Sequence, residues 1–185
     1  MRQSPRMQRS VTARAARTPV VRHFSSTPTL ALNIDNIVDK KYETSTLSEI
    51  AAAPISALQG LADSADATGE QLKLTSVRAL GMNKHVAWAR ALVALAPYEL
   101  AEHRAAASTL NVNLALDKAH EGKTLKEIVE LPPSALQGVA AHADDAWAAL
   151  GVKTIGDLGT WKFGAAAHAI ATLAACEAPD VSQHK

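Results

Sequence analysis

The sequence predicts an all-α fold made of two tandem copies of a small multi-helix module. The 185-residue chain is 48% hydrophobic and rich in alanine but only 4% aromatic. That composition favours close-packed helices, because strands are enriched in aromatic and β-branched residues. Helix-capping patterns of the Thr-x-x-Glu type precede apolar segments at two places. The phrase PISALQG at residues 54–60 returns as PPSALQG at residues 132–138.

The recurring phrase belongs to a longer internal duplication. A gapless shift of 78 residues places TLSEI at residues 46–50 on TLKEI at residues 124–128, and the Leu-Gly pair at 80–81 on the pair at 158–159. The connector between the copies contains no Gly or Pro, so we expect it to be helical. The predicted units are a first repeat (residues 32–99), the connector (100–109), a second repeat (110–177) and a tail (178–185).

The segment before the phrase is predicted to form two helices in each repeat. Apolar residues at i, i+3 and i+4 spacing predict the first helix. In the first repeat these residues are Ile34, Ile37, Val38 and Tyr42. A capping box then starts the second helix, at Thr46 in the first repeat and at Thr124 in the second.

The phrase itself is predicted to end one helix and start the next. Proline should end the preceding helix, because the residue before a proline disfavours the α conformation. The Ser-x-x-Gln pattern predicts a further capping box, and the glycine allows the chain to turn early. The predicted turn and cap positions are Pro54, Ser56, Gln59 and Gly60 in the first repeat and Pro132, Ser134, Gln137 and Gly138 in the second.

Further helices are predicted after the phrase. Residues 63–74 and 141–150 have helical patterns, and Gly151 is the expected C-cap of the second of these segments. Thr154 is the expected N-cap of the helix that follows. The last helix of the first repeat, at residues 84–96, is apolar nearly all round, which predicts that it is the buried central helix of its own repeat.

The first 31 residues are predicted to be a mitochondrial transit peptide. They contain six arginines, many serines and threonines, and no acidic residue, as is typical of such peptides. Residues 22–31 resemble a two-step cleavage pattern that would leave Leu32 as the mature N-terminus, with a single cut after Phe24 as the alternative. A plastid peptide and a disordered basic arm that binds nucleic acid or an acidic surface are the other interpretations.

Removal of this segment would make the chain acidic. Without the six arginines, 13 basic residues stand against 18 acidic ones, so the formal charge is −5. We expect this mature form in the mitochondrial matrix. The longest apolar run, around residues 165–176, is too short to span a bilayer.

Part of each repeat resembles the helix-hairpin-helix family. The residues that carry this resemblance are LQGV at 136–139 and LGVKTIGDL at 150–158. In that family a short helix, a glycine hairpin and a second helix lead into such a turn. The similarity covers residues 54–81 and 132–159, and it implies an all-helical module.

The resemblance also implies a way to bind nucleic acid. Members of the family often hold the DNA backbone non-specifically, through hairpin amides of a Gly-hydrophobic-Gly turn with nearby Lys or Arg. Here the turns read Gly-Leu-Ala at residues 60–62 and Gly-Val-Ala at 138–140, and aspartates follow them. Carboxylates repel phosphate, so we expect the fold to be kept without this use.

No catalytic, cofactor-binding or metal-binding residue is predicted. The histidines do not recur between the repeats and form no His-x-x-x-His or Glu-x-x-His pair. Cys176 is the single cysteine, which excludes an intramolecular disulfide. The chain has no phosphate-binding glycine loop of the Walker or dinucleotide type.

Trp88 and Trp161 are the candidate partner contacts. Each tryptophan is private to one repeat, and Trp161 stands opposite polar Asn83 in the alignment. Tryptophan is enriched where proteins bind one another. The alternative for both is core packing between two non-identical halves.

The sequence therefore predicts a non-catalytic mitochondrial protein that acts through protein–protein interaction. Its expected role is that of a scaffold, an assembly factor or an accessory subunit of a larger complex. One alternative is a nucleic-acid-binding helix-hairpin-helix protein of the mitochondrial genome or ribosome. The other is a carrier of a small molecule or lipid, with a pocket between the repeats.

Overall fold

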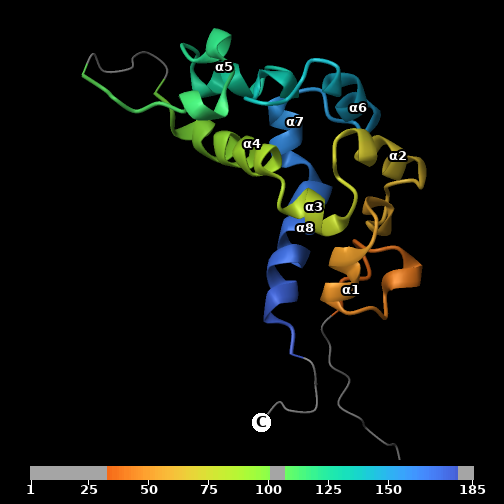
Figure 1. The fold of residues 1–185 in the computed structure, drawn as a ribbon. Coiled ribbons are helices and arrows are strands. Elements are labelled where there is room, and N and C mark those ends of the chain that lie inside the picture. The colour runs from red at the N-terminus through yellow and green to blue at the C-terminus, as the bar shows by residue number, and fades with distance from the viewer. Residues whose placement is uncertain (1–32, 101–106, 179–185) are drawn as a thin grey trace, which may run out of the picture. The chain divides into compact units, whose positions relative to one another are not determined.

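A computed structural model describes residues 33–100 and 107–178. The predicted transit peptide, the middle of the connector and most of the tail lie outside these residues. Within them the protein is all-α, as predicted, and none of its helices is long and apolar enough to cross a membrane. The α-helices are α1 (Leu47–Ala52), α2 (Ser64–Gln71), α3 (Val77–Gly81), α4 (Lys84–Leu95), α5 (Leu125–Val129), α6 (Ala143–Ala149), α7 (Ile155–Thr160) and α8 (Lys162–Leu173) (Figure 1).

Short 3₁₀ helices complete the described chain, and most of them recur at the 78-residue shift. They are η1 (Lys40–Tyr42), η2 (Ile55–Ala57), η3 (Ala96–Tyr98), η4 (Asn113–Ala115), η5 (Lys118–His120), η6 (Pro133–Ala135) and η7 (Ala174–Cys176). Of these, η4 alone has no 3₁₀ counterpart in the first repeat, where residues 35–37 form a turn.

The prediction of a first helix through Ile34, Ile37 and Val38 is wrong. Val38 instead forms an isolated antiparallel bridge with Leu58. The backbone N–H of Asp39 donates to Ala57 O (2.9 Å), and that of Gln59 donates to Ile37 O (2.9 Å). These bonds to a distant segment hold Val38 and Asp39 extended after the turn at residues 35–37, so the repeated phrase pairs with a segment near the start of its repeat.

The second repeat forms the same bridge. Leu116 pairs with Leu136, the N–H of Asp117 donates to Ala135 O (2.9 Å), and that of Gln137 donates to Ala115 O (3.0 Å). When the amide of Gln137 is oriented with its nitrogen towards the neighbouring acceptors, it donates to Leu116 O (3.3 Å) and to Asp117 Oδ1 (3.0 Å). This glutamine therefore braces the bridge and does not cap a helix.

The predicted Ser-x-x-Gln capping boxes do not form. Pro54 and Pro132 precede the single-turn helices η2 and η6, whose starts have no side-chain cap. Ser56 is buried, and its N–H and Oγ donate to the two carboxylate oxygens of Asp66 (2.9 and 2.8 Å). In the second repeat the N–H of Ser134 donates to Asp144 Oδ1 (2.9 Å). In both repeats the serine therefore bonds to an aspartate ten residues further along the chain, because the chain turns too early for a local cap.

The other local signals are confirmed. Thr46, Thr124 and Thr154 each cap a helix in a full capping box. The prolines follow the ends of α1 and α5, and Gly60 and Gly138 turn the chain with positive φ angles of 106° and 86°. These signals involve residues within four positions of one another, which is why sequence patterns contain them.

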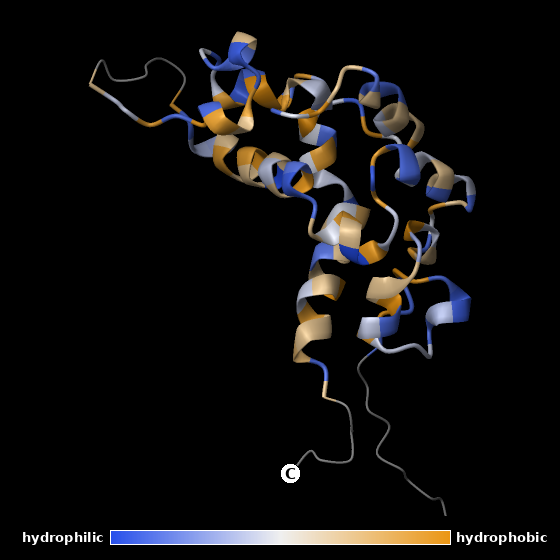
Figure 2. Cartoon of the chain, viewed as in Figure 1, coloured by the Kyte–Doolittle hydropathy of each residue, from blue (hydrophilic) through white to orange (hydrophobic). Residues whose placement is uncertain are grey.

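One core runs through both repeats of the described chain. Its members include Ile50, Ile55, Leu80, Leu136 and Ile155, which are essentially inaccessible to solvent. Figure 2 shows apolar residues along the two long helices, α4 and α8. At its described ends the connector is not helical, since Leu100 is irregular and Ala107 lies in a turn.

Candidate functional site

The most extensive contacts between helices join one repeat to the other. The last helix of the second repeat, α8, packs along α3 and against α1 of the first repeat. Reciprocally, α4 of the first repeat packs along α7 and against α5 of the second (Figure 1). Each repeat is therefore completed by the last helix of the other. The prediction that residues 84–96 form the central helix of their own repeat is wrong.

Two glycines allow the exchanged helices to approach closely. A Cβ placed on Gly81 of α3 would lie 2.3 Å from Ala167 O of α8. A Cβ on Gly159 of α7 would lie 2.6 Å from Ala89 O of α4. Both distances fall inside van der Waals contact with backbone atoms, so only glycine fits at either position. The two contacts are related by the 78-residue shift, on both their glycine and their alanine sides.

Two glutamates, each just beyond the C-terminal end of an exchanged helix, accept hydrogen bonds from the other repeat. Glu177, just beyond η7, accepts hydrogen bonds from the N–H groups of Leu47 (2.7 Å) and Ser48 (3.0 Å) at the start of α1. These hydrogen bonds hold the pKa of Glu177 below its ordinary value, and the bond from the Ser48 N–H has the largest effect. Burial partly opposes this shift. Its carboxylate thus satisfies orphan donors of a helix from the other repeat.

The first repeat makes the equivalent contact. Glu99 accepts from the N–H groups of Leu125 (2.9 Å) and Lys126 (3.1 Å) at the start of α5. Glu99 and Glu177 coincide at the 78-residue shift, and each serves the opposite repeat. The capping contacts and the packing contacts therefore have the same cause: the last helix of each repeat lies against the other repeat.

Histidines break the symmetry of the junction. His85, at the start of α4, lies with Nε2 3.1 Å from Gln137 O of the second repeat. Burial lowers the pKa of His85, and the bond to that carbonyl partly offsets the effect. His168 of α8 lies with Nδ1 3.0 Å from Gly81 O. Both rings bridge the repeats, but they stand at non-equivalent positions.

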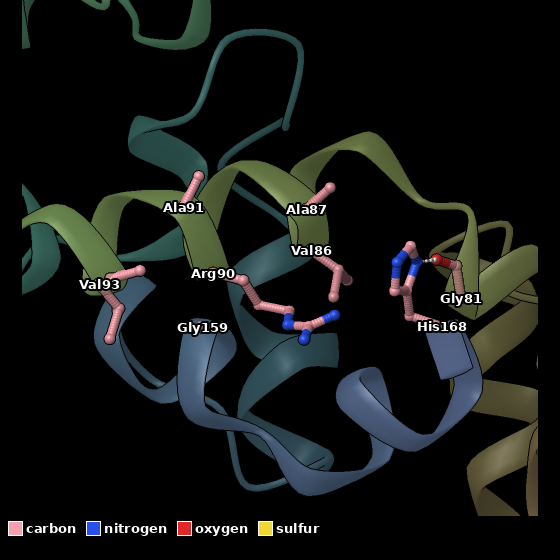
Figure 3. A pocket seen from close by; sticks show the side chains of 9 residues that line it. Gly81, Val86, Ala87, Arg90, Ala91, Val93, Gly159 and His168 are labelled. Atoms are coloured by element: carbon pink, nitrogen blue, oxygen red, sulfur yellow. Dashed lines mark hydrogen bonds between the residues drawn. The ribbon is translucent and has the colours of Figure 1, made fainter. Parts of the chain in front are cut away.

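A groove of about 520 Å³ lies between α4 and α8, where the repeats meet. Val86, Arg90 and Ala91 line it from α4, and His168 lines it from α8 (Figure 3). Gly159 of α7 completes one wall. Arg90 and His168 coincide at the 78-residue shift, so this groove lies where equivalent points of the two repeats face each other.

The two candidate tryptophans have different surroundings. Trp161 is half-buried and packs edge-on against Trp147 (6.1 Å between ring centroids) and Phe163 (5.4 Å). Trp88 is half-buried beside His85 (5.4 Å), with Lys84 Nζ 5.0 Å from its ring centroid. The contacts of Trp161 favour the packing alternative for that residue.

Sequence reasoning missed the residues that meet at the junction. The 78-residue shift aligns Gly81 with Gly159 and Arg90 with His168, but the alignment does not show whether the two repeats pack against each other. The signal that could have located them was the matched Gly–Ala pairs together with the short links before α4 and α8.

The described residues contain no group of three or more His, Cys, Asp or Glu side chains placed to hold a metal ion. Cys176 is exposed and is not part of a disulfide. Comparison of the chain with protein-family models, with curated proteins and with solved structures finds no match.

Proposed function

We propose that this chain is a non-catalytic mitochondrial helical repeat protein that acts by binding other proteins. In this role it serves as a scaffold, an assembly factor or an accessory subunit of a larger complex. The repeats unite around one core, so the partner meets a single rigid body. The helix-hairpin-helix resemblance remains part of the proposal, as a description of the module from which each repeat derives.

The observation that supports this proposal is that most of the large exposed apolar side chains among the described residues lie close in sequence to the connector. Leu95 and Tyr98 precede it, Leu100 is its first residue, and Leu110 and Leu114 follow it. Leu114 is 91% exposed and Tyr98 is 82% exposed. Large apolar side chains gathered on a surface typically mark a site where another protein binds.

Affinity purification with cross-linking from mitochondria tests the proposal. The wild-type chain is compared with a Tyr98→Ser, Leu114→Ser double variant, which changes only exposed side chains. Met82→Ser is the matched control, because Met82 is 65% exposed but lies between α3 and α4. We expect a defined partner with wild type and the control, and its loss with the double variant. Recovery of wild type as a lone monomer would refute the proposal.

One observation favours nucleic-acid binding as a second candidate function. Lys162 Nζ of α8 lies 3.7 Å from where a Cβ of Gly60 would stand, and Lys84 Nζ of α4 lies 3.9 Å from the same point on Gly138. Each hairpin glycine therefore faces a lysine supplied by the other repeat. Lysine beside a glycine turn is an arrangement that suits a phosphate.

Titration with duplex DNA and with RNA at low and moderate salt separates the two functions. Phosphate binding releases counterions, so a true interface loses affinity steeply as salt rises. A Lys84→Gln, Lys162→Gln variant should then reduce the salt slope by about two, one for each phosphate that no longer faces a lysine. Binding that is tight, salt-dependent and sensitive to this variant would displace the protein-binding proposal.

A further inference from the structure

The groove between α4 and α8 contains the guanidinium of Arg90, which is not paired with any of the described residues. Arg90 points into the groove from α4 (Figure 3). Among the described residues, its guanidinium has no hydrogen-bond acceptor and no carboxylate within ion-pair distance. None of the residues that line the groove is acidic. A half-buried guanidinium with five donors and no acceptor is suited to an anion from outside.

The neighbouring histidine presents an acceptor. Nδ1 of His168 lies 3.0 Å from Gly81 O, and a carbonyl can only accept, so Nδ1 carries the proton of this bond. In the neutral ring the other nitrogen, Nε2, is then left as an acceptor. Figure 3 shows this nitrogen facing the groove, on the side of Arg90.

The walls of the groove set the size and polarity of a ligand. Val86, Ala87, Ala91, Val93 and Ala94 supply apolar surface beside the guanidinium. The volume of about 520 Å³ lies within the range of small-molecule sites. A single guanidinium forms a bidentate pair with a planar, singly charged carboxylate. The lining supplies no Lys and no second Arg to balance the further charge of a phosphate dianion.

We propose that this groove binds a small hydroxycarboxylate with a short apolar chain. The carboxylate pairs with the Arg90 fork, the hydroxyl donates to Nε2 of His168, and the chain lies on the alanines and valines of α4. The site exists only because the helices are exchanged, since Arg90 and His168 come from different repeats. This goes beyond the proposed protein-binding role and does not depend on it.

Titration of the full 185-residue chain, followed by backbone amide NMR at pH 8, tests the proposal. The probes are 2-hydroxybutyrate, butyrate and inorganic phosphate. We expect saturable shifts at Gly81, Ala91, Gly159 and His168 with both carboxylates, and tighter binding of the hydroxy acid. Arg90→Gln should weaken binding by about tenfold or more, as expected for removal of a charge-assisted bond.

Two further variants make the test specific. Arg78→Gln removes the same charge from an exposed position on α3 and should leave the affinity unchanged. His168→Phe should abolish the preference for the hydroxy acid while butyrate still binds. The proposal is overturned by an absence of saturable shifts, by equal losses of affinity in Arg78→Gln and Arg90→Gln, or by phosphate binding more tightly than either carboxylate.

Discussion

Replacing Gly81 by alanine tests the exchange of helices most directly. The added Cβ would lie 2.3 Å from Ala167 O, 2.5 Å from the Ala167 carbonyl carbon and 2.8 Å from His168 N. All three are backbone atoms of α8, so no side-chain rotation can relieve the contact. The variant must either push α8 away from α3 or distort one of the two helices.

The expected cost follows from two opposing effects. Alanine in place of a helical glycine stabilises a free helix by about 0.5–1 kcal/mol. Overpacking of a well-packed site typically costs about 1–3 kcal/mol, and backbone contacts place Gly81 at the upper end of that range. We therefore expect Gly81→Ala to lower the free energy of unfolding by about 2 kcal/mol. Gly159→Ala, with backbone and side-chain contacts at 2.6 Å, should behave similarly.

Urea unfolding followed by far-UV circular dichroism measures this difference. With a slope of about 2 kcal/mol per molar urea, the midpoint should fall by roughly 1 M. Gly122→Ala is the matched control, because a Cβ there meets no atom within 4 Å, and we expect a change below about 0.5 kcal/mol. Equal midpoints for Gly81→Ala and Gly122→Ala would refute the close approach of α3 and α8, and with it the exchanged arrangement.

Three other predictions concern the same contacts. Glu177→Gln should lower the urea midpoint near neutral pH. The variant should also lose less of its free energy of unfolding than wild type as the pH is lowered. The bonds that depress the pKa of Glu177 stabilise the fold fully above the ordinary pKa of 4.5, and this stabilisation is lost as the pH falls through the lower pKa of the folded state. Asp66→Ala should lower the free energy of unfolding by about 2 kcal/mol, because it leaves the N–H and Oγ of a buried serine without their acceptors. Asp144→Ala, which removes one such bond, should lower it by about half as much, and urea unfolding measures both. Fragments 33–109 and 110–178 should each lack cooperative thermal unfolding alone and regain it when mixed; a fragment that unfolds cooperatively alone would contradict the exchange.

Local structure was largely predictable from the sequence. The threonine capping boxes and the hairpin glycines depend on residues a few positions apart, and they were found where predicted. The bounds of α4 also match the prediction closely, whereas α2 ends at Gln71 and not at residue 74. Lys73 shows the limit of such rules. It occupies the position equivalent to Gly151 and takes the same left-handed conformation, with φ of 59° against 82°. The turn is kept even where the residue that favours it is missing.

Long-range pairing was not predictable in the same way. The i, i+3, i+4 spacing of Ile34, Ile37 and Val38 is compatible with a helix, but residues 35–37 form only a turn and bonds to residues 57–59 hold the chain extended after it. Likewise, Arg90 and His168 are 78 residues apart and meet only because α4 and α8 change places. The candidate groove therefore became visible only in the folded chain.

The links before α4 and α8 explain why the last helices change places. Two antiparallel helices need a loop of about two to five residues between them. Trp161 alone separates α7 from α8, and in the first repeat Met82 and Asn83 separate α3 from α4. The Asn83 side chain is already committed, since its Oδ1 caps α4 by accepting from two backbone N–H groups (2.9 and 3.2 Å).

A helix that cannot fold back onto its own repeat leaves uncovered the surface on which it would have packed. Short links between otherwise complementary elements favour exchange with a second copy of the same fold. Here the second copy is in the same chain, and its open surface carries the matching residues, with Gly81 against Ala167 and Gly159 against Ala89. The one-residue link before α8 is too short for α8 to fold back, whereas the two-residue link before α4 is at the lower limit of that range. With α8 packed on the first repeat, α4 packs on the surface that α8 leaves open on the second repeat, and the exchange is reciprocal. The folding unit is therefore the pair of repeats, and any surface that depends on the junction exists only in the pair.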